Sequence, residues 1–126
     1  MKLANAGDAK AQYDVGWLYN HGEEIPIDFN EAKKWYLKSA AQGNSNAQLG
    51  LGILYYNGNG VAKSLKKAYS WYLKSAEQGN EQAQNRLAKM YDAGEGIKRN
   101  QSEAIRWYKK SAIQGDEDSS YILALK

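Results

Sequence analysis

Apolar residues recur along the chain at the spacing of amphipathic helices. Within residues 9–20 they lie three or four positions apart, and so fall on one side of a helix. The same stripe returns 36 residues later, and the two sets are Ala11, Val15, Leu18 and Tyr19, then Ala47, Leu51, Leu54 and Tyr55. A second stripe within residues 29–42 consists of Ala32, Trp35, Tyr36, Ser39 and Ala40. The pattern predicts pairs of α-helices and essentially no strands.

A repeat of 36 residues organises these helices. The decapeptide WYLKSAAQGN at residues 35–44 returns almost unchanged at 71–80 and, as WYKKSAIQGD, at 107–116. Such a period is typical of stacked helical units that cover one another's apolar faces. Short polar residues precede each expected helix and can accept hydrogen bonds from its free amides: Asp8, Asp28, Asn44, Ser64, Asn80, Asn100 and Asp116. Gly43, Gly79 and Gly115 follow the second helix of each unit, where a left-handed residue commonly ends a helix.

The register divides a single repeat domain into units. We expect three full units at residues 8–43, 44–79 and 80–115. Residues 2–7 align with the end of a second helix, and residues 116–126 align with a first helix. The chain therefore reads as a piece of a longer array.

Composition adds little chemistry to this architecture. The 126 residues carry 17 basic and 14 acidic side chains, and the net charge of +3 is spread along the chain, which does not indicate a nucleic-acid or membrane partner. With no cysteine and His21 as the single histidine, we expect no catalytic residues, no metal and no cofactor. No apolar leader is present, which slightly favours the cytoplasm for the chain as given and leaves export of a longer parent protein open.

The joint motif is specific enough to suggest a family. AQ followed by a tyrosine and a glycine in the first helix, with WY, KSA and QG in the second, resembles the Sel1-like repeat, a relative of the tetratricopeptide repeat. The resemblance covers nearly the whole chain. It implies an all-α, right-handed superhelical solenoid of antiparallel helix pairs, with the first helices lining a concave groove. It also implies a protein-interaction scaffold or adaptor and not an enzyme.

One loop departs from the family pattern. The second and third units carry Gly-x-Gly at residues 58–60 and 94–96, whereas the first has Gly22-Glu23-Glu24. If this position requires a positive φ, Glu24 is strained by on the order of 1 kcal/mol. Otherwise the first loop takes another path.

The groove-facing positions of the first helices are the candidate binding site, because residue types there change from unit to unit. They are Tyr13, Trp17, Asn20, Leu49, Ile53, Tyr56, Asn57, Asn85 and Lys89. Trp17 is the one tryptophan outside the 36-residue register, so packing between units does not explain it. Partly exposed aromatic clusters tend to mark interaction sites. The alternative is that Tyr13 and Trp17 pack against a preceding unit.

These residues favour a protein or peptide partner in the groove, with Trp17 and Tyr56 as aromatic anchors. A small-molecule or glycan-binding module, in which the same rings stack on sugar faces, is the alternative, and a hydrolase is a weaker one. The partial units also predict weak end-to-end association through Tyr121, Leu123, Leu125 and the N-terminal segment, because solenoids need polar capping repeats for solubility.

Overall fold

The computed structural model describes residues 7–126, and within them every regular element is an α-helix. The helices are α2 (Ala9–His21), α3 (Phe29–Ala41), α4 (Ser45–Asn57), α5 (Leu65–Glu77), α6 (Glu81–Ala93), α7 (Gln101–Ile113) and α8 (Glu117–Leu125). The prediction of an all-α repeat fold is confirmed. The expected helix tail at residues 2–7 lies, apart from Gly7, outside the described residues.

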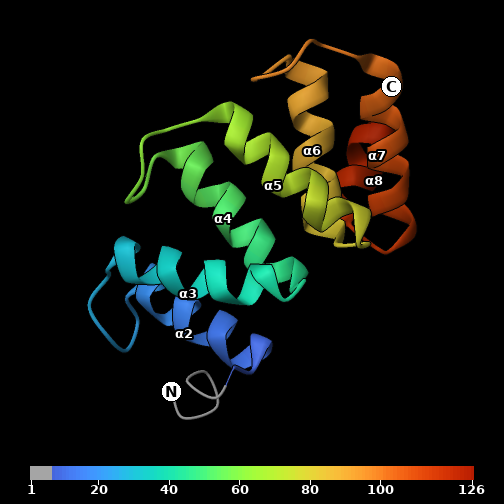
Figure 1. The fold of residues 1–126 in the computed structure, drawn as a ribbon. Helices are drawn as coiled ribbons and strands as arrows, with labels where there is room; N and C mark the ends of the chain where they lie inside the picture. Colours follow the sequence, from blue (N-terminus) through green and yellow to red (C-terminus); the bar gives the residue numbers. More distant parts are fainter. Residues whose placement is uncertain (1–6) are drawn as a thin grey trace.

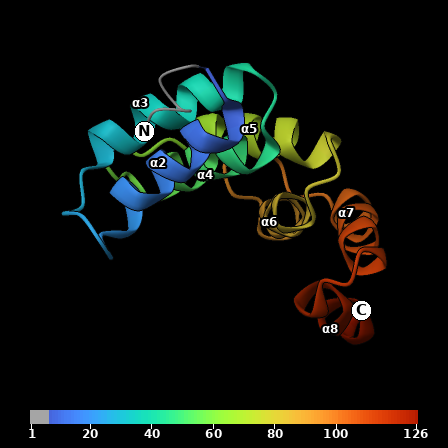
Figure 2. The same ribbon diagram turned by 90° about the horizontal axis from the view of Figure 1, so that it is seen from below.

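Each helix packs against its neighbours in sequence, and the pairs stack into a curved solenoid (Figure 1). Figure 2 shows this curve from below, as an arc that runs from α2 and α3 at one end to α8 at the other. Helices α2, α4, α6 and α8 lie toward the inner side of the arc, and α3, α5 and α7 lie toward the outer side. The first helix of each unit therefore borders the concave face.

The helix ends follow the local signals in the sequence. All seven predicted N-cap side chains accept a hydrogen bond from the backbone amide three residues further on; Asp8 Oδ1, for example, lies 2.7 Å from the amide nitrogen of Ala11. Gly43, Gly79 and Gly115 have φ values of 89°, 96° and 102°. These glycines allow the chain to leave one helix and enter the N-cap of the next at once.

The centre of each unit is a buried tyrosine of the second helix: Tyr36, Tyr72 or Tyr108, each 1% exposed. Glycines let the first helices approach these rings closely. A Cβ at Gly16 would lie 2.6 Å from Tyr36 Cδ1, and a Cβ at Gly50 would lie 2.9 Å from Cε2 of the same ring. One ring thus fills the space between two successive units. The tryptophans one residue earlier are also core residues, although Trp71 stays partly exposed while Trp35 and Trp107 are buried.

Buried polar side chains link the two helices of a unit. Ser39, Ser75 and Ser111 donate to the carbonyl oxygens of Ala9, Ser45 and Glu81 at 2.5, 2.8 and 2.7 Å. The glutamines of the AQ and QG motifs also pair: Gln42 with Gln12, Gln78 with Gln48, and Gln114 with Gln84. A buried polar group needs a hydrogen-bond partner, and each of these groups finds it on the other helix of its unit. The pairs therefore favour one packing arrangement of the two helices.

The first loop is not strained at Glu24, because every positive φ among the described residues belongs to glycine. The loop takes another path, which was the second of the two expectations. In the later units, a Cβ at Gly60 or Gly96 would lie 2.5 Å from Phe29 Cβ or 2.6 Å from Leu65 Cβ. The second glycine is therefore needed where a loop packs against the second helix of the preceding unit.

Candidate interaction groove

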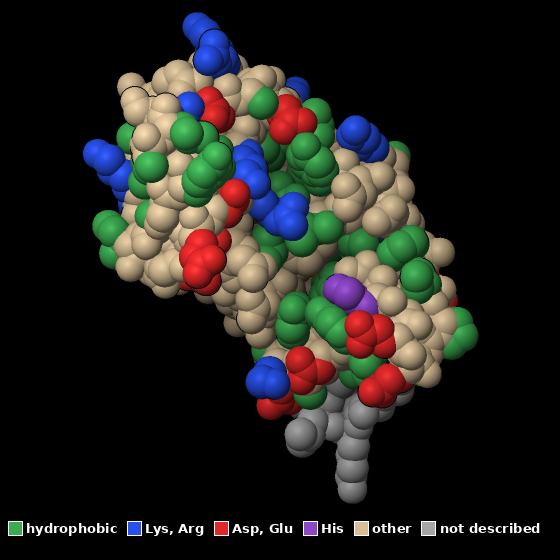
Figure 3. All heavy atoms as spheres, turned by 180° about the vertical axis from the view of Figure 1, so that it is seen from behind, with side chains coloured by type: hydrophobic (Ala, Val, Ile, Leu, Met, Phe, Trp, Pro, Cys, Tyr) green, Lys and Arg blue, Asp and Glu red, His purple; other side chains and the backbone are tan. Residues whose placement is uncertain are grey.

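The concave face holds a hollow of about 310 Å³, here called the aromatic hollow. Helices α2, α4 and α6 supply most of its lining, which consists of Tyr13, Trp17, Asn20, His21, Tyr36, Asn46, Leu49, Gly50, Ile53, Gln82 and Arg86. Figure 3 looks onto this face, where His21, in purple, lies beside hydrophobic side chains and basic side chains gather near the middle. Five of the nine predicted groove residues meet here.

The rings of α2 are held by their neighbours. Trp17 stacks on His21 with 3.9 Å between ring centroids and an interplanar angle of 16°, and His21 Nδ1 lies 2.9 Å from the carbonyl oxygen of Trp17. Tyr13 stacks on Tyr36 at 5.7 Å, and Asn20 Nδ2 donates to the hydroxyl of Tyr36 at 3.4 Å. These contacts fix one side of the aromatic hollow before any ligand arrives.

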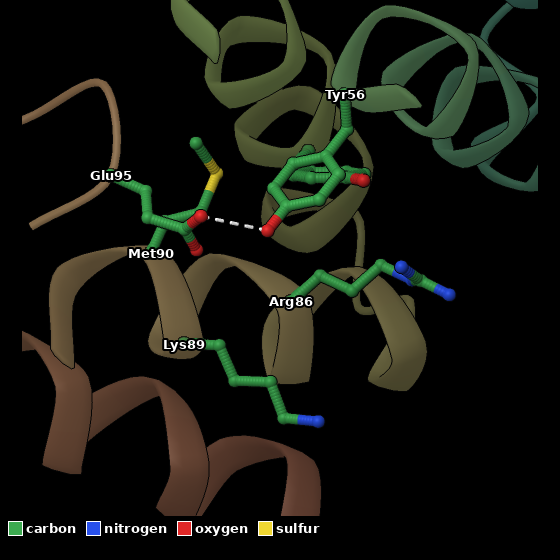
Figure 4. A pocket seen from close by; sticks show the side chains of 6 residues that line it. Tyr56, Arg86, Lys89, Met90 and Glu95 are labelled. Atoms are coloured by element: carbon green, nitrogen blue, oxygen red, sulfur yellow. Dashed lines mark hydrogen bonds between the residues drawn. The ribbon is translucent and has the colours of Figure 1, made fainter. Parts of the chain in front are cut away.

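Tyr56 lies in a second, smaller hollow of about 90 Å³, together with Tyr72, Arg86, Lys89, Met90 and Glu95. Its hydroxyl donates to Glu95 Oε2 at 2.8 Å, the dashed line in Figure 4, and this bond is the main reason why its pKa is raised. Arg86 and Lys89 extend from α6 away from Glu95. Tyr56 is therefore oriented by the loop of the following unit.

A third hollow, of about 180 Å³, holds Asn85 and Lys89 beside Gln82, Arg86 and Asp116. Asn85 is 8% exposed, and its Nδ2 lies 2.8 Å from Ser119 Oγ, 3.0 Å from Asp118 Oδ2 and 3.2 Å from Asp116 Oδ2. Lys89 Nζ pairs with Asp118 Oδ2 at 2.8 Å. Both side chains bind residues at the start of α8. They therefore have fewer hydrogen-bonding groups left for a ligand in the groove than the sequence suggested.

Two other predicted residues are placed differently from expectation. Leu49 lines the aromatic hollow but is only 7% exposed and belongs to the core as well. Asn57 is exposed at the end of α4, in register with His21, and lines none of the three hollows. Tyr13 and Trp17 face the groove in this structure, and packing against a further unit stays an alternative for them.

Arg86 was missed by the sequence reasoning, although it lines all three hollows. It occupies the register position of Asp14 and Gly50, where the residue type changes from unit to unit. It also follows Gln82 by four residues, which places both on one face of α6. These two signals were available in the sequence.

One lysine near the end of each second helix lies over the repeated tryptophan of that helix. Lys38, Lys74 and Lys110 have their Nζ atoms 4.4, 4.9 and 5.1 Å from the ring centroids of Trp35, Trp71 and Trp107. Lysine side chains commonly lay their aliphatic stems over aromatic rings while the charged amine stays in water. This arrangement gives these three lysines a structural role that requires no anionic ligand.

Neither a metal centre nor a membrane span is found in the part of the chain that the structure describes. No group of three His, Cys, Asp or Glu side chains there is placed to hold a metal ion. No helix of residues 7–126 is long and apolar enough to cross a bilayer.

Comparison with known proteins gives a consistent result. The sequence model of the Sel1 repeat matches residues 9–44, 45–80 and 81–116. No curated protein matches the chain.

Solved structures are similar over nearly all of the chain. A protective antigen of uropathogenic Escherichia coli with an SLR fold is 39% identical, with a TM-score of 0.91 over 96% of this chain and 26% of the antigen. This chain thus spans about a quarter of that antigen. A Sel1 repeat protein from Oxalobacter formigenes is 34% identical, with a TM-score of 0.88 over 98% of this chain and 92% of that protein. Cysteine rich protein B of Helicobacter pylori is 23% identical and has the same fold, with a TM-score of 0.78 over 90% of each chain.

Proposed function

Because this chain belongs to the Sel1 repeat family, whose members are generally protein-interaction scaffolds, we propose that it binds a segment of a partner protein in its concave groove. The fold of this family is typically non-enzymatic. The chain would then act by holding a partner and not by catalysing a reaction.

The observation that carries the proposal is the aromatic hollow. Its volume of about 310 Å³ suits one or two side chains of a bound segment, and Trp17, Tyr13 and Ile53 offer partly exposed apolar surface there. Aromatic residues in such positions contribute much of the free energy of binding at protein interfaces. Asn20 and Gln82 add amides that can donate to and accept from a peptide backbone.

Truncation of the aromatic anchors tests the proposal. A displayed library of random linear peptides would be selected on the immobilised chain, and the enriched peptides would be titrated by calorimetry. We expect Trp17→Ala or Tyr56→Ala to weaken binding by about 2 kcal/mol or more, because each removes a ring from a partly desolvated hollow. Circular dichroism would check that each variant keeps its helices.

A double change on the outer face is the matched control. Lys66→Ala with Lys67→Ala alters two exposed side chains of α5 and should leave affinity unchanged. The proposal fails if peptides bind through these lysines and ignore Trp17 and Tyr56, or if the library gives no binder. A glycan panel run on the same surface would identify the small-molecule alternative.

A further inference from the structure

Arg86 lines all three hollows, and no ion pair among the described residues neutralises its charge. Across residues 7–126, no carboxylate oxygen lies within 4.0 Å of its guanidinium, whereas the neighbouring Lys89 is paired with Asp118. The side chain is exposed on the concave side of α6. Its fork of donors interacts with the nearby hydroxyl of Tyr72 but is not paired with a carboxylate, so it can bind a planar anion.

The aromatic hollow has a charge pattern that suits an acidic ligand. Of its eleven lining residues, Arg86 is the only Lys or Arg, and none is Asp or Glu. Gly50 of α4 also lines this hollow and contributes no side chain to it. An arginine at the edge of an apolar hollow pairs more strongly with a carboxylate than one in open water, because less solvent screens the pair.

A second observation comes from Tyr72, which lines the adjoining hollow together with Arg86. Its side chain is 1% exposed, and no group of the described residues makes a close hydrogen bond to its hydroxyl. Burial raises the pKa of Tyr72 to about 12, although the guanidinium of Arg86 lies near enough to lower this pKa through its charge and a weak hydrogen bond, so the hydroxyl keeps its proton at neutral pH. Buried hydroxyls are seldom left without a partner, and this one can donate to an acceptor that reaches the hollow beside Arg86.

We infer that the groove recognises an acidic side chain, Asp or Glu, of the bound segment, and that Arg86 is the residue that binds its carboxylate. An aromatic or aliphatic residue next to that acid fills the aromatic hollow against Trp17 and Ile53. The hydroxyl of Tyr72 can donate a further hydrogen bond to the carboxylate, next to Glu95 of the same hollow, which already accepts a hydrogen bond from Tyr56. The inference rests on the proposed function, because it names the chemistry of the segment that the groove holds.

The position of Arg86 favours an acid within the segment over a terminal carboxylate. Arg86 lines the aromatic hollow together with residues of α2 and α4, and it lines the third hollow together with Asp116 at the start of α8. A bound chain can therefore continue past Arg86 in both directions. A chain terminus would need a closed end of the groove at this point.

The test uses blocked peptides from the library selection described above. Enriched sequences are synthesised with acetylated and amidated ends, and each Asp or Glu is replaced in turn by Asn or Gln. We expect one acid adjacent to an apolar residue to be required, with a loss of about tenfold to a hundredfold when it is neutralised, as for a hydrogen bond to a charged group. Arg86→Gln should cause a similar loss. Combining the two changes should add little, because both remove the same contact.

Two variants separate recognition from general effects. Lys109→Gln removes one positive charge from the exposed outer face of α7 and should leave affinity unchanged. Tyr72→Phe should change the melting temperature little, because the hydroxyl makes no close hydrogen bond within the described residues, but it should weaken binding of the acidic peptide several-fold. A peptide in which the acid is replaced by Lys should regain affinity for Arg86→Glu.

The outcomes distinguish this inference from the proposed function. If enriched peptides depend on Trp17 but no acid matters, or if Arg86→Gln leaves affinity intact, carboxylate recognition is wrong and groove binding stands. If only peptides with a free C-terminal carboxylate bind, the internal acid is wrong. If no peptide binds, or if binding ignores Trp17, both fail.

Discussion

Single glycines decide how closely neighbouring units approach one another. Gly60 and Gly96 have φ values of 71° and 70°, and each lies against the first residue of the preceding unit's second helix. Gly79, with φ of 96°, has no heavy atom within 4 Å of a Cβ built on it. Gly60 and Gly96 are needed both for their backbone conformation and for a close contact, whereas Gly79 is needed for its conformation alone.

This difference predicts unequal effects of alanine. Gly79→Ala should cost about 1 kcal/mol of unfolding free energy, the strain of a left-handed residue with a Cβ. Gly60→Ala should cost on the order of 1–3 kcal/mol more, because its Cβ would also collide with Phe29. Urea unfolding followed by circular dichroism measures both, with Gly79→Ala as the internal control. Equal losses would show that the loop moves away from α3 at little cost.

At the scale of elements, α8 differs from the other helices because polar contacts hold much of it. Asn85 and Lys89 of α6 bind residues 116–119, and Lys126 Nζ lies 3.1 Å from Asp92 Oδ1. Hydrogen bonds from Lys89 and Asn85 lower the pKa of Asp118, and the bond from Lys89 has the larger effect. A hydrogen bond from Gln101 is the main cause of the lowered pKa of Asp92.

These shifts predict that acid loosens α8 first. A carboxyl group whose pKa is lower in the folded state stabilises it above the unfolded pKa, and that stabilisation is lost as the pH falls through the folded value. Below about pH 4, α8 amides should therefore exchange hydrogen faster relative to those of α4. Asp92→Asn with Asp118→Asn should flatten this pH dependence, at a cost of no more than about 1 kcal/mol for each partly exposed pair. Glu117→Gln is the control, and equal acid sensitivity of α4 and α8 would contradict the prediction.

At the scale of the whole molecule, apolar side chains are exposed at the α8 end of the solenoid. Tyr121 and Leu125 are 66% and 69% exposed. Leu123, expected among them, is partly buried and packs against the core that includes α6 and α7, so it offers less surface to the predicted contact than the other two. The N-terminal segment of that prediction lies, up to residue 6, outside the described residues.

We still expect weak self-association of this chain through this surface, because Tyr121 and Leu125 expose apolar side chains there. Tyr121→Ser with Leu125→Ser should reduce it in sedimentation equilibrium, from a dissociation constant on the order of 0.1–1 mM. Ile27→Ser is the matched control, since Ile27 is 54% exposed in the loop between α2 and α3. Sedimentation of the unaltered chain as a strict monomer at millimolar concentration would rule the contact out.

The sequence by itself determined the helices, their caps and their period. Each of these depends on residues a few positions apart, such as an N-cap side chain and the amide three residues later. The repeat then multiplies one local solution, so the signals of three units support one another. The close approach of helices at Gly16 and Gly52 could also be predicted from the sequence, because a glycine has no side chain to hold a neighbouring helix away.

Only the tertiary structure decided which groove positions remain available to a ligand. Leu49 and Asn85 lie on the predicted face, but the angle between successive units buries one and directs the amide of the other to α8. The same stacking brings Arg86 into one hollow with Gly50 and into another with Tyr72, whose hydroxyl it influences. Whether a residue is available in the groove depends on side chains from three different units. Helical spacing within one unit carries no information about how those units pack together.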